Sequence, residues 1–293
     1  MVKIGVYGKS FSPGFDSDIT LLFNILKEKN AEVIVFKPFL DYIRTEKHIN
    51  PGFEKTFSNY NMVEPNMDFM FSIGGDGTFL ETVSHVRGKN IPIIGLNTGR
   101  LGFLSNVAKE EIIPSINALF EKKYTLEKRT LLTVDSGGML FKEYNCALNE
   151  ISVQKKGSAM ITVHAYANNE FINSYWTDGL IISTPTGSTA YALSVGGPII
   201  EPGSKSITIL PIAPHNLNVR PLILNDNLEI KLKVEGRVNS FLVTSDYRSE
   251  EFDGSRELII KTAPFTVKTI KLLGNTFYNT LRNKLMWGAD KRN

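Results

Sequence analysis

Hydrophobic residues in the first 120 positions follow two different periods. Continuous apolar runs at positions 2–7 and 33–36 are typical of buried strands. Between them lies the i, i+3, i+4, i+7 spacing of an amphipathic helix, at Ile19, Leu22, Phe23 and Leu26. A strand, a helix and a second strand in this order predict a βαβ unit with a parallel sheet.

The same alternation continues to about position 122. It predicts a strand near 69–73, a helix from about 78 to 87 and a strand at 91–96. A further helix is expected with its buried face at Ile112, Ile113, Ile116, Leu119 and Phe120. The stretch 38–66 is less regular and contains three prolines, so we expect a helix and a loop there. Residues 1–122 are therefore predicted to form an α/β domain.

After Lys122 the pattern changes to successive β-rich segments. They are joined by turn pairs, which are Gly137-Gly138, Asn168-Asn169, Asn225-Asp226 and Asp253-Gly254. Apolar and charged residues alternate from Leu228 to Val234, as in a strand with one buried face. We predict a mostly antiparallel, β-rich domain over 123–273. The tail from about 274 to 293 is expected to contain a helix and to pack back on the first domain.

Composition narrows the possible partners. The 293 residues are 42% hydrophobic and carry a net charge of only +3 with both signs spread along the chain, which does not indicate nucleic-acid binding. A single cysteine, Cys146, excludes an internal disulfide and fits a reducing compartment. No apolar stretch approaches the ~18 residues of a membrane span. We expect a cytoplasmic protein without membrane contact.

The sequence Gly74-Gly75-Asp76-Gly77-Thr78 follows the apolar run at 69–73 and is the strongest functional motif. A glycine-rich turn between a strand and a helix directs backbone N–H groups at an anion such as a phosphate. A carboxylate in such a turn is explained if it binds a metal, holds a hydroxyl or accepts a proton. This combination suggests phosphoryl transfer to a hydroxyl, although a capped tight turn would have the same composition.

Two other phosphate motifs fit poorly. Gly8-Lys9-Ser10 resembles the end of a P-loop, but Lys3 occupies the position of its opening glycine. The residues from Gly75 to Leu80 partly match the dinucleotide fingerprint, but Leu80 replaces the third glycine.

A second polar cluster runs from Asp178 to Tyr191 through Thr184, Thr186, Ser188 and Thr189. Its hydroxyls and amides suit the edges of ribose and adenine, and Tyr191 offers a face for stacking. A capped helix with surface threonines is the structural alternative.

Together these clusters make the chain resemble the NAD kinase family, whose members phosphorylate the 2′-hydroxyl of the adenosine ribose of NAD to make NADP. The resemblance covers nearly the whole chain in the family's order. Its motifs are Gly74 to Thr78, Asn97 to Leu104, Leu148-Asn149-Glu150, Thr184 to Tyr191, Gly196-Gly197-Pro198 and Pro211 to His215.

The resemblance implies a role for individual residues. Asp76 would orient the acceptor hydroxyl and take its proton, while Gly75 and Gly77, with Thr78, would leave room for the phosphates. The position of Arg100 in a glycine-rich loop after a strand predicts a cation near these phosphates, with a solvated side chain as the alternative. Asn149 and Glu150 would hold ribose hydroxyls. The family's adenosine pocket would be lined by Thr189, Ala190, Tyr191 and Ser194, and Phe103 would be the aromatic residue that closes over it.

Asp178 and Ala213 match positions that reach the adenine from a neighbouring subunit, so the resemblance implies a homodimer or homotetramer. It also implies Mg²⁺ or another divalent cation, with ATP as donor and polyphosphate as a possible substitute. One departure is Asp246-Tyr247, where many members have Asp-Gly. We therefore leave this segment out of the predicted site.

Two rival functions remain open from the residues. Diacylglycerol and sphingosine kinases share the Gly-Gly-Asp-Gly-Thr turn, but their second Gly-Thr motif follows closely, whereas Gly77 and Gly187 lie 110 residues apart here (187 − 77). A non-catalytic NADP sensor would have no need for Asp76.

Overall fold

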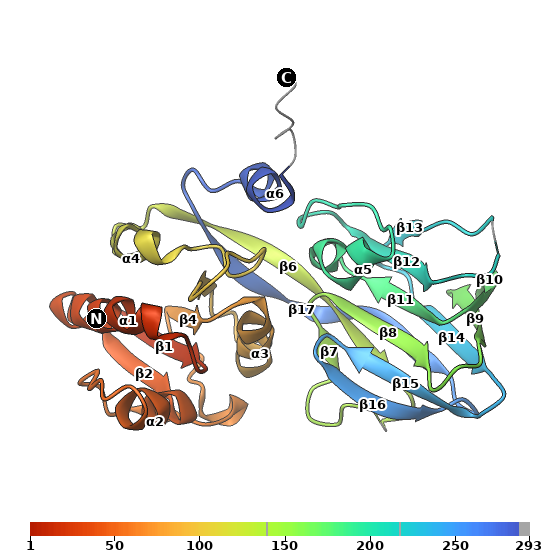
Figure 1. Cartoon of the computed structure of the whole chain (residues 1–293), viewed down its shortest axis with the longest axis horizontal. Coiled ribbons are helices and arrows are strands. Elements are labelled where there is room, and N and C mark those ends of the chain that lie inside the picture. The colour runs from red at the N-terminus through yellow and green to blue at the C-terminus, as the bar shows by residue number, and fades with distance from the viewer. Residues whose placement is uncertain (139, 217, 287–293) are drawn as a thin grey trace, which may run out of the picture. The chain divides into compact units, whose positions relative to one another are not determined.

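The computed structural model describes residues 1–138, 140–216 and 218–286. Its contacts divide the chain into unit 1, with residues 1–128 and 267 onward, and unit 2, with residues 129–266. Both boundaries fall inside long strands, β6 (Tyr124–Asp135) and β17 (Leu258–Leu272) (Figure 1). The sequence prediction placed the boundaries at the ends of these strands, near 122 and 273, because periodicity detects where a strand ends and not where its contacts change.

Unit 1 is built on a parallel sheet with the strand order β3-β2-β1-β4-β5. Thr269 of β17 pairs in parallel with Ile93 of β5. The elements of the unit are β1 (Lys3–Gly8), α1 (Asp16–Glu28), β2 (Glu32–Phe36), α2 (Lys37–Thr45), β3 (Thr56–Phe57), β4 (Phe69–Ile73), α3 (Asp76–Val86), β5 (Ile93–Leu96), α4 (Ile112–Phe120) and α6 (Phe277–Leu285).

Helices cover the sheet of unit 1 because each carries an apolar stripe. The predicted stripe of α1 is fully buried and shares a core with α4 and with one face of the strands. The buried residues of α3 lie outside this core and pack against β4, β5 and β1. The prediction that Ile113 belongs to the buried face of α4 is wrong, because this residue is 38% exposed. Ile112 and Ile116, four residues apart, lie on one face of the helix, and Ile113 lies to the side of that face.

Unit 2 contains two antiparallel sheets packed face to face. One has the order β13-β12-β11-β8-β15-β16, and the other consists of β10-β9-β14-β17, with β6 pairing β17 and β7. Apolar residues from both sheets form one core. The elements are β7 (Cys146–Ala147), β8 (Glu150–Lys155), β9 (Ile161–Ala167), β10 (Glu170–Thr177), β11 (Gly179–Ser183), α5 (Tyr191–Ser194), β12 (Ser206–Ile212), β13 (Leu222–Asn225), β14 (Ile230–Glu235), β15 (Ser240–Ser245) and β16 (Arg248–Asp253).

The predicted alternation is confirmed in β14, where Ile230, Leu232 and Val234 are buried. Of the four predicted turn pairs, Asn168-Asn169 closes a two-residue hairpin, and both residues have positive φ as a type I′ turn requires. Gly137-Gly138 lies in the longer connection between the paired strands β6 and β7. The hairpin β15–β16 is closed instead by Asp246-Tyr247. The fold class predicted from the sequence, an α/β domain followed by an antiparallel β-rich domain, is confirmed.

The predicted tail helix corresponds to α6, whose N-cap Thr276 accepts a hydrogen bond from the amide of Asn279 at 3.1 Å. Residues 287–293 of that prediction lie outside the described residues. Within the described part of the chain, no helix has the length and apolar character that crossing a membrane requires.

Candidate active site

The turn after β4 leaves open space above its glycines. Gly74 has a φ of +149°, and a Cβ there would lie 2.3 Å from the Thr78 hydroxyl oxygen, so another residue does not fit. By contrast, a Cβ on Gly75 or Gly77 would meet no atom within 4 Å. The N-terminus of α3 therefore faces free space, which is the arrangement that anion-binding turns use.

The carboxylate of Asp76 joins this turn to the loop after β5. Its Oδ2 accepts the amide N–H of Phe103 at 2.9 Å, and its Oδ1 accepts those of Leu104 at 3.0 Å and Ser105 at 2.9 Å. Gly102 lies so close that a Cβ on it would be 1.8 Å from Oδ1. Because β4 and β5 are parallel neighbours, both loops leave the same edge of the sheet, where ligands bind in α/β folds.

Asp76 thus also has a structural role that the sequence does not predict, because it attaches the turn after β4 to the loop after β5. The motif predicts a metal, a hydroxyl, a proton or a helix cap as the use of the carboxylate, and it gives no sign of an attachment to a second loop. A carboxylate oxygen has two lone pairs. Oδ2, which holds a single amide, retains acceptor capacity for a hydroxyl donor.

The other predicted residues of unit 1 surround the same loop. Arg100 is exposed, and its carbonyl accepts the side-chain amide of Asn97 at 3.0 Å. Phe103 is half-buried, with the ammonium group of Lys284 from α6 5.6 Å from its ring centre.

In unit 2, the Leu148–Glu150 segment packs directly on the second polar cluster. The amide of Thr184 donates to the carbonyl of Asn149 at 2.9 Å, and the Thr184 hydroxyl donates to the carbonyl of Leu148 at 2.6 Å. A Cβ on Gly187 would lie 2.1 Å from the carbonyl oxygen of Asn149. Glycine is therefore required at 187 by a close backbone approach, which brings the two predicted motifs together.

The predicted adenosine-lining residues follow this contact on a short 3₁₀ helix and α5. Thr189 and Ala190 are half-buried, and Tyr191 is 37% exposed, so its ring has a face available for stacking. The Ser194 hydroxyl donates to the carbonyl of Tyr191 at 2.8 Å.

Asp246, which the sequence analysis left out, holds the Leu148–Glu150 segment in place. Its carboxylate accepts the amides of Leu148 and Asn149 at 2.8 Å each and that of Glu150 at 3.3 Å. Asp246 adopts a φ of +52° in the β15–β16 turn, a conformation that Asp tolerates better than most residues. The resemblance to Asp-Gly sequences was a usable signal, but the Tyr247 departure led us to discard it.

The predicted residues Asp178 and Ala213 lie together but away from Glu150. The amide of Asp178 donates to the carbonyl of Ile212, next to Ala213, and the Asp178 carboxylate is 2.6 Å from the ammonium group of Lys155. In the pairing of β8 with β11, Ser183 opposes Glu150, whereas Gly179, next to Asp178, opposes Gln154. By this register Asp178 lies five residues along the strands from Glu150, about 16 Å at ~3.3 Å per residue.

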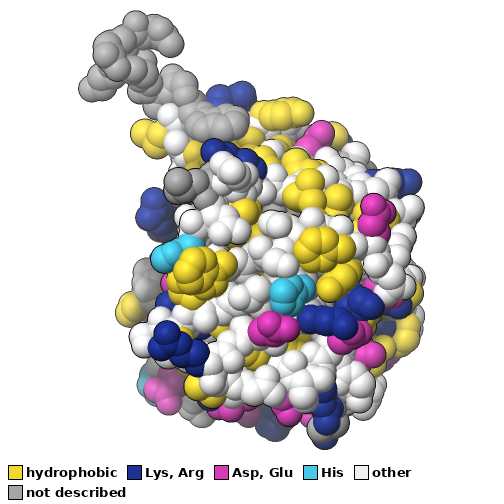
Figure 2. Space-filling view, turned by 90° about the vertical axis from the view of Figure 1, so that its right-hand side faces the viewer, with side chains coloured by type: hydrophobic (Ala, Val, Ile, Leu, Met, Phe, Trp, Pro, Cys, Tyr) yellow, Lys and Arg dark blue, Asp and Glu magenta, His cyan; other side chains and the backbone are white. Residues whose placement is uncertain are grey.

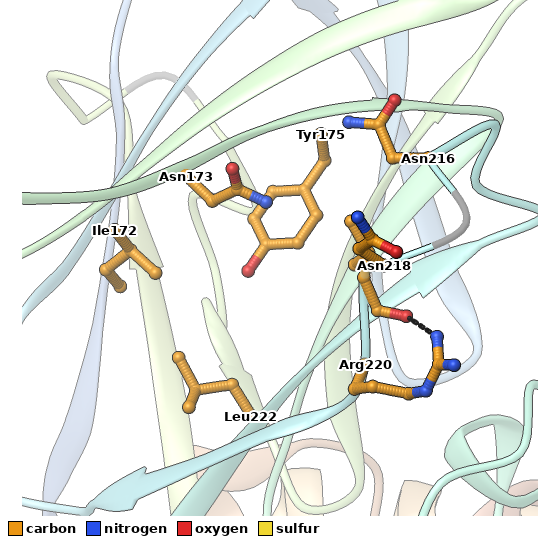
Figure 3. Close-up of a pocket in the computed structure, with 8 residues that line it drawn as sticks. Ile172, Asn173, Tyr175, Asn216, Asn218, Arg220 and Leu222 are labelled. Carbon is orange, nitrogen blue, oxygen red and sulfur yellow. Dashed lines mark hydrogen bonds between the residues drawn. The ribbon is translucent and has the colours of Figure 1, made fainter.

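A separate hollow of about 590 Å³ opens in unit 2 (Figure 3), lined by Ile172, Asn173, Tyr175, Asn216, Asn218, Val219, Arg220 and Leu222. It includes none of the predicted site residues. It adjoins the Ala213 end of the strands, because the amide of His215 donates to the carbonyl of Trp176 at 2.9 Å. The face on this side carries separate hydrophobic groups, with positive and negative side chains next to one another (Figure 2).

Among the described residues, no group of three or more His, Cys, Asp or Glu side chains could hold a metal ion. Mg²⁺ in phosphoryl-transfer sites takes one or two protein carboxylates and is otherwise held by substrate phosphates and water.

Comparison with known proteins decides the family. Residues 24–124 match the model of the ATP-NAD kinase N-terminal domain, and residues 148–272 match that of the C-terminal domain. The chain belongs to the ATP-NAD kinase family. An NAD kinase of Christiangramia forsetii is 45% identical over 100% of both chains, and one of Bacteroides fragilis is 41% identical over 99% of this chain and 100% of its own.

Two solved structures of this family are similar to the chain. The NAD kinase of Archaeoglobus fulgidus in complex with ATP has a TM-score of 0.74 at 26% identity, covering 97% of this chain and 99% of that one. Yeast NADH kinase complexed with NADH has a TM-score of 0.85 at 23% identity, covering 99% and 89%, which shows a common fold.

Proposed function

We propose that the protein transfers the γ-phosphoryl group of ATP to the 2′-hydroxyl of the adenosine ribose of NAD, giving NADP. Its membership of the ATP-NAD kinase family supports an NAD kinase enzyme with ATP as donor. The observation that carries the residue assignment is the close packing of Asn149 and Glu150 on the Thr184–Tyr191 segment. This packing groups an amide, a carboxyl and an exposed aromatic ring in a way that suits a nucleoside.

In this proposal Asn149 and Glu150 hold the ribose diol, and the ring of Tyr191 stacks on the adenine. Thr189, Ala190 and Ser194 line the same adenosine pocket, and Phe103 closes over it. The open space above Gly75 and Gly77, with Thr78 and Arg100 nearby in the two loops of unit 1, receives the phosphates.

Asp76 is proposed to orient the acceptor hydroxyl through the remaining acceptor capacity of Oδ2. Phosphoryl transfer has a loose transition state, so positioning and neutralisation of charge contribute more than proton removal. A divalent cation such as Mg²⁺, bound chiefly through the phosphates of the donor, would supply that neutralisation.

Sharing of the site between subunits completes the proposal. Asp178 and Ala213 would reach the adenine of a neighbouring subunit in a homodimer or homotetramer. Their position at the far end of β8 and β11 from Glu150 supports this arrangement. The exposed Trp176 beside them, at 52% exposure, offers apolar surface for the contact.

One assay tests the activity. Purified protein with ATP, Mg²⁺ and NAD should form NADP, detected by an NADP-specific dehydrogenase, and diacylglycerol or sphingosine in place of NAD should give no phosphorylated product. Binding of NADP without its formation from NAD would support the sensor function and overturn our proposal. Replacing ATP by polyphosphate in the same assay identifies the range of donors.

A further inference from the structure

Glu150 carries a buried carboxyl oxygen that has no partner. The residue is only 8% exposed, and its Oε2 makes no hydrogen bond. An unpaired buried oxygen is costly unless a ligand satisfies it. The amide N–H of Tyr191 lies close enough to the Glu150 carboxyl to favour its charged form, which places this carboxyl beside the polar cluster.

The surroundings of Glu150 contain a second carboxyl group at close range. Asp246 accepts the Glu150 amide N–H at 3.3 Å, and the residue is half-buried. Arg248 of β16 lies on the other side, where its guanidinium donates to the hydroxyl of Ser245 at 2.9 Å and to the carbonyls of Tyr144 and Cys146. Tyr191 also lies beside Glu150, and its amide N–H favours the charged form of the Glu150 carboxyl. Tyr247 follows Asp246 in the β15–β16 turn.

These surroundings give the two carboxyl groups different pKa values and different protonation states at pH 7. Burial raises the pKa of Asp246 to about 6, while its three amide donors and Arg248 oppose that rise, so it is ionised at pH 7. Burial and the charge of Asp246 raise the pKa of Glu150 to about 8, so it is protonated at pH 7. Paired groups with such different environments commonly divide acid and acceptor roles.

We propose that Asp246 is a positioning residue of the acceptor site and that Glu150 meets the ribose as a carboxylic acid, donating its O–H to a ribose oxygen. This inference rests on the proposed NAD-binding function. Asp246 acts through the backbone of Leu148–Glu150, and its negative charge keeps the proton on Glu150. The affinity for NAD is then constant between about pH 7, where Asp246 is ionised, and about pH 8, and it falls up to tenfold per pH unit above pH 8.

Calorimetric titration of the full-length protein with NAD, without ATP, from pH 6 to 9.5 tests the state of Glu150. The wild type should lose affinity above pH 8. Glu150→Gln keeps an N–H donor and has no proton to lose, so it should remove the alkaline loss and weaken binding at pH 7 by only about 3-fold. Glu150→Ala, which has no donor, should weaken binding about 30-fold, as expected for loss of a buried hydrogen bond worth ~2 kcal/mol. Affinity that rises between pH 7 and 9, or a Gln variant as weak as the Ala variant, overturns the acid role.

The role of Asp246 has its own readout. Asp246→Asn removes the charge that raises the Glu150 pKa, so the alkaline loss of affinity should begin at a lower pH, in addition to a weaker affinity overall. Asp253→Asn, at the other end of the same hairpin, serves as the control. It should change neither the affinity for NAD nor the pH at which that affinity begins to fall. If Asp246→Asn instead weakens NAD binding by the same factor at every pH, and the midpoint of the alkaline loss stays where it is in the wild type, Asp246 has only a structural role.

Different results would overturn the proposed NAD kinase function and the proposed roles of Glu150 and Asp246. If the wild-type protein forms no NADP in the kinase assay, the proposed function fails. If it forms NADP while the NAD affinity does not decline above pH 8, only the inference on Glu150 and Asp246 fails.

Discussion

Two aspartates hold a loop by the same arrangement in the two units. Asp76 accepts three successive amides at 103–105, and Asp246 accepts three at 148–150. Hydrogen bonds to an ionised carboxylate are shorter and about twice as strong as those between neutral groups. An Asn at either position has the same shape but presents its N–H₂ group to an amide N–H, so at least one of the three bonds is lost.

Asp76→Asn is therefore expected to lower kcat at least 100-fold, since it removes the charge beside the acceptor hydroxyl and disturbs the 103–105 loop. NADP formation, NAD affinity and melting temperature should be measured together. Asp41→Asn, in an exposed ion pair with Lys37, is the matched control and should change none of them. Activity within a few-fold of the parent would remove Asp76 from the mechanism.

Gly102→Ala separates the two roles of Asp76. The added Cβ would lie 1.8 Å from Oδ1, so the loop or the carboxylate must shift, but the substitution keeps the charge of Asp76. If Asp76 acts on the acceptor as well as on the loop, the Gly102 variant keeps clearly more activity than Asp76→Asn at equal substrate saturation. Equal losses in the two variants would mean that Asp76 acts through the loop alone.

Tyr191→Ala is expected to weaken NAD binding about 10-fold, because aromatic stacking contributes ~1–1.5 kcal/mol. An adenosine with a small 5′ substituent should compete with NAD and lose affinity in this variant by a similar factor. Tyr278→Ala, which removes another exposed tyrosine ring in α6, should leave both affinities unchanged. Failure of the adenosine fragment to compete at millimolar concentration would show that the acceptor pocket has been misplaced.

At the scale of elements, hydrophobic periodicity predicted which face of a helix or strand is buried. The stripe of α1 and the alternation in β14 were read correctly, because burial of one face imposes each pattern along the chain. Ile113 was misassigned for the same reason, since an apolar residue at the edge of a stripe looks like part of it. The β15–β16 hairpin was missed because its turn contains Asp-Tyr and no glycine.

The attachments that build the site were beyond this reasoning. Asp76 contacts amides 27–29 positions away, and Asp246 contacts amides 96–98 positions away. The donors are backbone groups, which every residue provides and which leave no mark in the sequence. The motifs themselves were recognisable, but the physical reason for Gly102 and Gly187, the close approach of a carboxylate and of a carbonyl, becomes apparent only in the fold.

The packing of α3 predicts a sensitivity to acid. His85 lies against the rings of Tyr7, Phe36 and Phe57, and its Nδ1 is buried without a partner. Burial, followed by the charge of Arg87, lowers its pKa from 6.5 to about 4, against a smaller opposing effect of Glu81. The unfolded chain thus binds a proton that the folded chain excludes between pH 6.5 and 4. The stability that neutral His85 contributes is present above pH 6.5 and is lost as the pH falls through this window.

Urea unfolding at pH 7.5 and pH 5 measures this effect. The wild type should have a lower free energy of unfolding at pH 5, and His85→Leu should show a smaller decrease between the two pH values. The control variant His48→Asn, at an exposed position, should show the same decrease in the free energy of unfolding as the wild type. An identical decrease in His85→Leu and the wild type would assign the acid sensitivity to other groups.

At the scale of the whole molecule, the question is whether one chain supplies a complete adenosine site. Glu150 and Asp178 come from opposite ends of the paired strands β8 and β11, about 16 Å apart by register. The Asp178 carboxylate is partly exposed and held by Lys155, on a surface that also carries the exposed Trp176. This placement favours a second subunit as the source of the adenine contact, because a side chain so far along the strands points to a different part of the surface.

Mixed oligomers test this arrangement directly. Asp76→Asn and Asp178→Ala chains should each be weakly active alone. After co-refolding or co-expression with two different tags, and purification of oligomers that contain both, activity should reappear, because some sites then combine an intact Asp76 with an intact Asp178 from different subunits. A chain that carries both substitutions, mixed with wild type, is the matched control, because every shared site that joins one chain of each kind then lacks either Asp76 or Asp178. Oligomers verified to contain both single variants but no more active than either parent would mean that each site is built from one chain.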